Sequence, residues 1–221
     1  METKNGGTLG KLKFAIIPVT RLQQNCTLWW DDISFEGAIV DPGGDLDYIK
    51  QMIQKARMQP TKILLTHGHI DHAGGAHQLQ EEFNIKIEGP HIDDEFLLNG
   101  LTRQTPQLDK SVRDVTSDRW LNDGDIVDVA GHPLEVRHCP GHTPGSVIYI
   151  SHKHRLIIMG DVMMKGRIGS TDLPYCNRRA LIDAIKSKIL PLGDDYAFIC
   201  GHGNGSLLGD ERELNPDLAD F

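Results

Sequence analysis

Short apolar stretches, rich in β-branched and aromatic residues, recur along the whole chain. The first half contains four of them, at residues 12–19, 26–30, 37–40 and 63–66. The second half contains five more, at residues 126–129, 134–139, 147–150, 156–159 and 197–200. Stretches of this length, bounded by Gly, Pro, Asn or Asp, predict β-strands.

Segments with helical spacing separate these strands. After the turn signal Asp41-Pro42-Gly43-Gly44, apolar residues recur every three or four positions over residues 46–56. This spacing predicts an amphipathic helix. Similar patterns predict helices at residues 73–83, 92–99 and 179–189. The tail after Gly205 is polar, and we expect it to be a cap or a loose end.

The order of strands and helices is typical of an α/β protein with a repeated theme in its two halves. Each half is rich in strands and is closed by helices, which predicts two β-sheets packed face to face with helices outside. No linker or low-complexity segment divides the chain. We therefore expect a polar leader at residues 1–11 and a single domain at residues 12–221.

Composition narrows the possible partners. The 221 residues are 39% hydrophobic and 24% charged, as in ordinary globular proteins. No apolar run is long enough to span a membrane, and residues 1–13 lack the apolar core of a secretory signal. A net charge of -8 without a basic block argues against nucleic acid. Four cysteines without a C-x-x-C pair suggest reduced thiols and a cytoplasmic protein.

The densest chemical signal lies directly after the apolar residues 62–65. His67, His69, Asp71 and His72 fall within six residues. Imidazole and carboxylate groups are ligands for zinc, iron or manganese. Such side chains resist burial unless they are paired or bound to a metal. The motif therefore predicts a metal centre, although a solvent-exposed polar loop is the simpler alternative.

Three further donors follow other predicted strands. His142 lies in Pro-Gly-His-Thr-Pro-Gly after residues 134–139, Asp161 follows residues 156–159, and His202 follows residues 197–200. Functional groups in α/β sheets gather at the carboxyl ends of strands. A glycine beside each donor permits close approach of the backbone. We therefore expect these side chains to join the first motif.

The combined motifs resemble the metallo-β-lactamase superfamily over nearly the whole chain. They are most similar to its glyoxalase II-like branch, including short bacterial proteins that lack a C-terminal helical domain; residues 24–26 and 41–44 match that branch as well. The resemblance implies the metallo-β-lactamase fold, an αββα sandwich. It also implies two sets of metal ligands: His67, His69 and His142 for one ion, Asp71, His72 and His202 for the other, with Asp161 bridging both. Asp41 would orient a ligand histidine, or simply open its turn.

The resemblance also implies a reaction. Two divalent ions, zinc in the first place with iron or manganese as alternatives, would generate a bridging hydroxide that attacks a thioester, with Asp71 orienting it. The implied substrate is S-lactoylglutathione or a related acyl-glutathione. Lys165, Arg167 and Tyr175 are candidate contacts for an anionic substrate, or else ordinary surface residues. Ser170 stands where the branch often has a basic residue, which weakens the prediction of glutathione recognition.

Other functions remain open at this point. A persulfide dioxygenase with a single iron shares the fold, and lactonases and β-lactamases use the same scaffold. A binding protein that has lost catalysis is a non-enzymatic alternative, although the full ligand set argues against it. Oligomeric state is left open. The remaining histidines that we assign no role in the site are His77, His91, His132, His138, His152 and His154.

Overall fold

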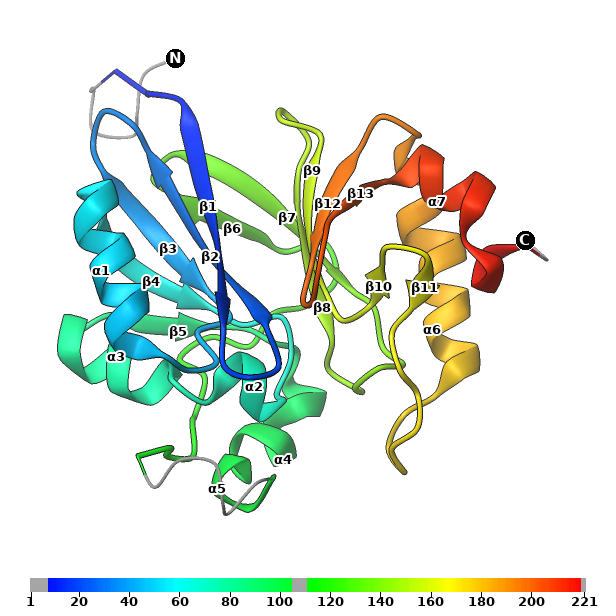
Figure 1. The fold of residues 1–221 in the computed structure, drawn as a ribbon, viewed down its shortest axis with the longest axis horizontal. Helices are drawn as coiled ribbons and strands as arrows, with labels where there is room; N and C mark the ends of the chain where they lie inside the picture. Colours follow the sequence, from blue (N-terminus) through cyan, green and yellow to red (C-terminus); the bar gives the residue numbers. More distant parts are fainter. Residues whose placement is uncertain (1–7, 105–110, 220–221) are drawn as a thin grey trace.

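The computed structural model describes residues 8–104 and 111–219, and it has two sheets between outer layers of helices (Figure 1). The first sheet has the order β1-β2-β3-β4-β5. Its strands are β1 (Leu12–Val19), β2 (Gln24–Asp31), β3 (Glu36–Val40), β4 (Gln59–Leu64) and β5 (Lys86–Glu88). The first three are antiparallel neighbours, and β3, β4 and β5 run parallel. Most of the predicted leader lies outside the described residues.

The second sheet has the order β13-β12-β9-β8-β7-β6. Its strands are β6 (Ile126–Val129), β7 (His132–His138), β8 (Val147–Ser151), β9 (Leu156–Gly160), β12 (Ala197–Cys200) and β13 (Ser206–Leu207). Only β9 and β12 pair in parallel, so both sheets are mixed. A separate ribbon joins β10 (Met163–Met164) to β11 (Arg167–Ile168). The predicted sandwich of two mixed sheets is confirmed.

On the first half lie the helices α1 (Leu46–Ala56), α2 (Ile70–Ala73), α3 (Ala76–Phe83), α4 (Glu95–Leu98) and α5 (Leu101–Gln104). On the second half lie α6 (Arg178–Ala184) and α7 (Leu208–Leu214). Helices α1 and α3 cover one outer face of the sandwich and α6 and α7 the other, whereas α2, α4 and α5 lie at its lower end in Figure 1. Helix α1 buries Ile49 and Ile53, four residues apart on one face, as its apolar spacing predicts. Within the described ranges, no helix is long and apolar enough to cross a membrane.

Apolar side chains fill three layers of core. One layer lies between the sheets and includes Trp29, Leu64, Val136 and Tyr149. The other two lie under the helices of each half. The Tyr149 hydroxyl donates to the Leu65 carbonyl at 2.7 Å, and the Val147 amide donates to the Thr66 carbonyl at 2.8 Å. These bonds tie the second sheet to the segment that carries the first histidines.

Several predicted elements differ from the structure. The helix predicted at residues 73–83 is divided into α2 and α3, because Gly74 and Gly75 pack their backbones against Pro42 and Gly43. The predicted helix at residues 92–99 begins with a 3-10 turn, Ile92–Asp94, before α4. The helix predicted at residues 179–189 becomes α6 followed by a wider π-helical turn, Ile185–Ile189.

Of the two alternatives for the tail after Gly205, the loose end is wrong and the cap agrees with the structure. These residues form β13, helix α7 and a final 3-10 turn, Pro216–Leu218. Leu208 and Leu218 are buried in the second-half core. Two isolated apolar anchors in a polar segment give little periodic signal, so the pattern along the chain did not indicate this packing. All four cysteines lie in the described part as free thiols, and only Cys176 is partly exposed.

Candidate metal centre

The structure brings all seven predicted donors together at one end of the sandwich. His67, His69 and His142 have donor atoms within 4.8 Å of one another, and so do Asp71, His72 and His202. The first motif leaves β4 at its carboxyl end, and the other donors follow β7, β9 and β12. Residues far apart in the sequence therefore meet because the strands that precede them end at the same edge.

The three-histidine set has the spacing of a metal site. His67 Nε2 lies 3.1 Å from His69 Nδ1, and His142 Nε2 lies 3.0 Å from the same atom. A tetrahedral zinc with Zn–N bonds of 2.0–2.1 Å holds its ligand nitrogens roughly 3.3 Å apart. Burial and the neighbouring imidazoles lower the pKa of His67, and the same causes lower the pKa of His69 to about 3. Both imidazoles are therefore neutral, as metal ligands must be.

The second set contains the carboxylates. Asp71 Oδ2 lies 3.1 Å from His202 Nε2 and 3.8 Å from His72 Nε2. Burial opposes ionisation of Asp71, but His72 and His202 outweigh it and hold the pKa of Asp71 at about 2. Asp71 is therefore a carboxylate at neutral pH.

Asp161 lies between the two sets. Its Oδ1 is 3.4 Å from His72 Nε2, and its Oδ2 is 3.6 Å from both His142 Nε2 and His202 Nε2. Although burial favours the neutral acid, the surrounding histidines, His72 first, lower the pKa of Asp161. An ionised carboxylate thus faces both groups of nitrogen donors.

Two atoms of this cluster are buried and have no hydrogen-bond partner in the described part of the chain. They are His72 Nε2 and Asp161 Oδ1. Leaving a buried polar group unsatisfied costs about 1–3 kcal/mol. A cation between these atoms would satisfy both, so the residues present fit a metal ion.

In three of the histidines, Nδ1 points away from the cluster and makes a hydrogen bond, which leaves Nε2 free to bind a metal ion. The contacts are His72 Nδ1 with Asp41 Oδ2 at 2.9 Å, His142 Nδ1 with the Ser170 carbonyl at 2.8 Å, and His202 Nδ1 with the Leu22 carbonyl at 3.1 Å. Carboxylate and carbonyl oxygens only accept, so each Nδ1 carries the proton. This arrangement fixes the tautomer that a metal needs.

Asp41 combines both roles considered from the sequence. It stands in the turn after β3 with a φ of 50° and contacts His72. Its carboxylate also accepts from the Thr66 amide at 2.8 Å and from the Thr66 hydroxyl at 2.6 Å. The turn therefore holds the start of the first motif as well as one of its histidines.

Asp94 is a supporting residue that the sequence pattern did not reveal. This fully buried carboxylate accepts from the amides of Gly68 at 2.8 Å and Gly145 at 2.6 Å, and from the Thr143 hydroxyl at 2.8 Å. It thus joins the loop of His67 and His69 to the loop of His142. Burial raises the pKa of Asp94 to about 6. The sequence feature that could have indicated its burial is spacing, because Asp94 precedes the buried Leu97, Leu98 and Leu101 at intervals that place all four on one face of a helix.

Glycines permit the closest contacts around the cluster. A Cβ on Gly43 would lie 1.5 Å from the Asp71 carbonyl oxygen, and a Cβ on Gly201 would lie 1.9 Å from Asp161 Oδ1. No side chain fits at either position. Gly201, which precedes His202, therefore allows the close approach predicted beside a donor, and Gly43 in the turn after β3 does the same beside Asp71 without having been predicted to.

The three predicted substrate contacts surround the cluster. The Tyr175 hydroxyl lies 2.8 Å from His69 Nε2, and burial raises the pKa of Tyr175 to about 12. Lys165 and Arg167 are exposed and line a cavity of about 290 Å³ together with His202. We name this the Lys165 cavity.

The histidines without a predicted role have other environments. His132 pairs with the buried Asp31 at 3.0 Å. The rings of His91 and His138 stack 4.0 Å apart and are tilted by 14°. Their ligand atoms and that of Asp93 lie within 4.8 Å of one another, and His138 Nε2 donates to the Pro144 carbonyl at 2.8 Å. His152 lies against Tyr196, and His154 contacts Ser151.

Comparisons with known proteins agree with this geometry. A profile described as "Metallo-beta-lactamase superfamily" matches residues 19–202. The protein named hydroxyacylglutathione hydrolase GloC of Haemophilus influenzae is 41% identical, with 94% of this chain and 98% of that protein covered. The probable metallo-hydrolase YqgX of Bacillus subtilis is 31% identical, with 95% and 99% covered.

Solved structures give the same picture. The BLEG-1 B3 metallo-beta-lactamase superposes with a TM-score of 0.83 at 31% identity, covering 94% of this chain and all of that one. TTHA1623 in a di-iron-bound form superposes with a TM-score of 0.81 at 28% identity, covering 91% and 98%. ETHE1 from Myxococcus xanthus, at 21% identity and a TM-score of 0.77, shares the fold.

Proposed function

This chain belongs to the metallo-beta-lactamase superfamily, and from that premise we propose that it hydrolyses acyl-glutathione thioesters, S-lactoylglutathione or a close relative. The relative at 41% identity, named a hydroxyacylglutathione hydrolase, supports glutathione as the thiol half. The observation that carries the proposal is the convergence of two donor sets with Asp161 between them.

The proposed cofactor is a pair of divalent cations, with zinc in the first place. His67, His69 and His142 would hold one, Asp71, His72 and His202 the other, and Asp161 would contact both. Such a pair, when bound, lowers the pKa of water and polarises a carbonyl oxygen. Imidazole and carboxylate donors accept zinc, iron and manganese alike.

Asp71 is the proposed catalytic residue. Its Oδ2 faces His202, and its ionised carboxylate has a second oxygen that can orient the attacking water. In the reaction, the attacking water releases its protons to solvent, its oxygen forms a bond to the acyl carbon, and the carbon–sulfur bond breaks with its electron pair leaving on sulfur. A thiol with a pKa near 8.5 leaves readily as thiolate, so a strong general acid is not required.

Tyr175, Lys165 and Arg167 are the proposed substrate contacts. Tyr175 stays protonated at neutral pH and holds His69 in place. Within the described part of the chain, neither Lys165 nor Arg167 has a carboxylate within salt-bridge distance. These two cations beside His202 suit the carboxylates of glutathione.

The test pairs metal analysis with two assays on the purified protein. We expect about two equivalents of metal and turnover of S-lactoylglutathione under argon, because hydrolysis consumes no oxygen. Oxygen uptake with glutathione persulfide, without cleavage of the thioester, would instead identify a persulfide dioxygenase and overturn the proposal. A Leu214→Trp variant, changed at an exposed leucine of α7, is the control for metal or activity lost during purification.

A further inference from the structure

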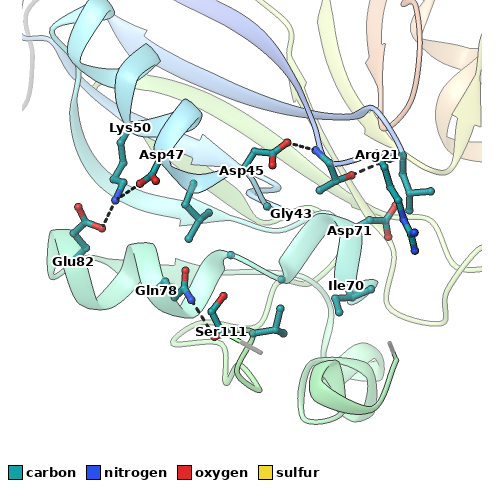
Figure 2. A pocket seen from close by; sticks show the side chains of 17 residues that line it. Arg21, Gly43, Asp45, Asp47, Lys50, Ile70, Asp71, Gln78, Glu82 and Ser111 are labelled. Carbon is teal, nitrogen blue, oxygen red and sulfur yellow. Dashed lines mark hydrogen bonds and ion pairs between the residues drawn. The ribbon is translucent and has the colours of Figure 1, made fainter. Parts of the chain in front are cut away.

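A second and larger cavity opens on the Asp71 side of the centre. It measures about 550 Å³ and lies among the β1–β2 turn, the start of α1 and the face of α3. We name it the Asp71 cavity. Figure 2 shows Arg21 and Asp71 at one end, and Lys50 with Asp47 and Glu82 at the other. Nothing in the proposed function uses this space.

The two cavities flank the same pair of donors. Asp71 lines the larger one and His202 lines the Lys165 cavity, while Asp71 Oδ2 and His202 Nε2 lie only 3.1 Å apart. A thioester has two arms, the thiol half and the acyl half, which diverge from the carbonyl carbon. A substrate whose carbonyl sits at this cluster can therefore extend one arm into each cavity.

The charges of the two cavities differ. The Lys165 cavity is lined by two cations that have no carboxylate partner among residues 8–104 and 111–219. The Asp71 cavity is lined by two cations and four carboxylates. Its Lys50 is held by Asp47 at 3.1 Å and by Glu82 at 3.2 Å. Arg21 has no carboxylate within salt-bridge distance among the described residues, but the four carboxylates of the Asp71 cavity outnumber its two cations. The balance of charge thus draws an anionic arm to the Lys165 cavity and not to the Asp71 cavity.

Apolar side chains also line the Asp71 cavity. They are Leu22, Leu46, Ile70 and Val112. Leu22 is 52% exposed, although a large apolar side chain gains from being covered. The volume lies in the range of about 300–1,000 Å³ that is common for small-molecule sites. A three-carbon lactoyl group would leave most of it unfilled.

We infer that the Asp71 cavity binds the acyl half of the substrate, and that it selects neutral apolar acyl chains longer than lactoyl over anionic chains of equal length. The inference rests on the proposed function, because it requires a thioester at the metal centre. It adds the class of acyl group that the protein prefers.

The first experiment measures kcat/KM for glutathione thioesters of acetyl, butyryl, hexanoyl and glutaryl groups. Each added methylene should raise kcat/KM about two- to four-fold, from the burial of apolar surface. Glutaryl, which is similar in length to hexanoyl but anionic, should fall below butyryl. A flat or falling series from acetyl to hexanoyl would overturn the inference.

The second experiment fills the cavity. Val112→Trp should lower kcat/KM for hexanoyl about ten-fold relative to acetyl, because a bulky ring displaces several methylenes. The matched control is Leu214→Trp, at a leucine 76% exposed on α7, and this variant should keep the wild-type series. An equal loss for every acyl group in Val112→Trp would contradict the assignment of the cavity.

A third variant tests charge. Asp47 has a side chain 92% exposed, so Asp47→Lys should fold normally and add positive charge to the rim. We expect kcat/KM for glutaryl to rise several-fold, with hexanoyl unchanged. If the variant instead changes the preference for the thiol half, measured with acetyl thioesters of glutathione and of neutral thiols, the two arms are reversed. If wild-type protein cleaves none of these thioesters, the proposed function fails rather than the acyl assignment.

Discussion

Strand β2 connects two buried clusters of histidine and carboxylate that behave differently. At its first residue, the backbone of Gln24 forms an isolated β-bridge with His202, and the Gln24 side chain contacts His72 at the metal centre. At its last residue, the Asp31 carboxylate contacts the His132 ring. Asp31 also accepts from the amides of Ile33 at 3.0 Å and Ser34 at 2.9 Å. The carboxylate of Asp31 is satisfied by these donors, whereas no described residue donates to Asp161 Oδ1.

The comparison shows that buried histidine and aspartate do not by themselves make a metal site. At the Asp31 end, one carboxylate meets one imidazole and two backbone amides. At the Asp161 end, carboxylate oxygens and the Nε2 atoms of histidines face one another, and both kinds of atom are acceptors. The protonated Nδ1 atoms of these histidines donate to partners outside the cluster. Among the described residues each end has one buried imidazole nitrogen without a partner, His132 Nδ1 or His72 Nε2, but only at the Asp161 end does a carboxylate oxygen also lack a donor, and a positive charge would satisfy both atoms there.

The largest expected difference between the two ends is in activity. Asp161→Asn or His69→Ala should abolish turnover and reduce bound metal together, beyond the 10- to 100-fold losses typical of residues that only support ligands. Asp31→Asn should keep both turnover and metal. Metal content and kcat/KM for S-lactoylglutathione are the measurements. A fully active Asp161→Asn variant would contradict the assignment of Asp161 to a metal centre.

Asp94 sharpens the comparison, because it is as buried and as well satisfied as Asp31 but binds loops that carry ligands. Asp94→Asn replaces an acceptor oxygen by a donor beside the amide of Gly68 or Gly145. We expect metal affinity to fall about 10- to 100-fold. Asp31→Asn, with a stability loss of about 1–3 kcal/mol, is the matched control. Titration with a chelator separates the two, and equal metal affinity in both variants would contradict a supporting role for Asp94.

A smaller effect is expected at the substrate contacts. Lys165→Met and Arg167→Met should raise KM for acyl-glutathiones several-fold and change kcat little, since neither side chain belongs to the donor sets. The effect should weaken as salt screens the charges. Steady-state kinetics at two ionic strengths test this, and a loss confined to kcat would place these residues outside substrate binding.

The smallest expected effect is the pH dependence at the Asp31 end. Burial opposes ionisation, but hydrogen bonds from Ser34, His132 and Ile33 outweigh it and lower the pKa of Asp31. A carboxylate with a lowered folded-state pKa stabilises the protein above its ordinary pKa near 3.9 and loses that contribution as pH falls further. The difference in free energy of unfolding between wild type and Asp31→Asn should therefore shrink between pH 7 and pH 3. Denaturant titrations at both pH values measure it.

Much of the fold could be predicted from the sequence because its signals are local. Strands such as β8 and β9 are short apolar runs between turn residues, and α1 repeats its apolar positions at helical spacing. Elements with few apolar residues gave weaker signals. Strand β5 has one isoleucine between charged residues, and α7 depends on Leu208 reaching a distant core.

The seven candidate metal donors were predictable because each lies in the segment that follows a strand, Asp71 and His72 within the short helix α2, and because histidine and aspartate are metal-ligand types. The sequence alone thus determined which residues could form the centre and which sheet edges would carry them. Tertiary structure decided the rest: Asp94 joins two ligand loops, Tyr175 reaches His69, and a cavity lies beside Asp71. These features arise from contacts between segments distant in the chain, where position depends on packing and not on any local pattern.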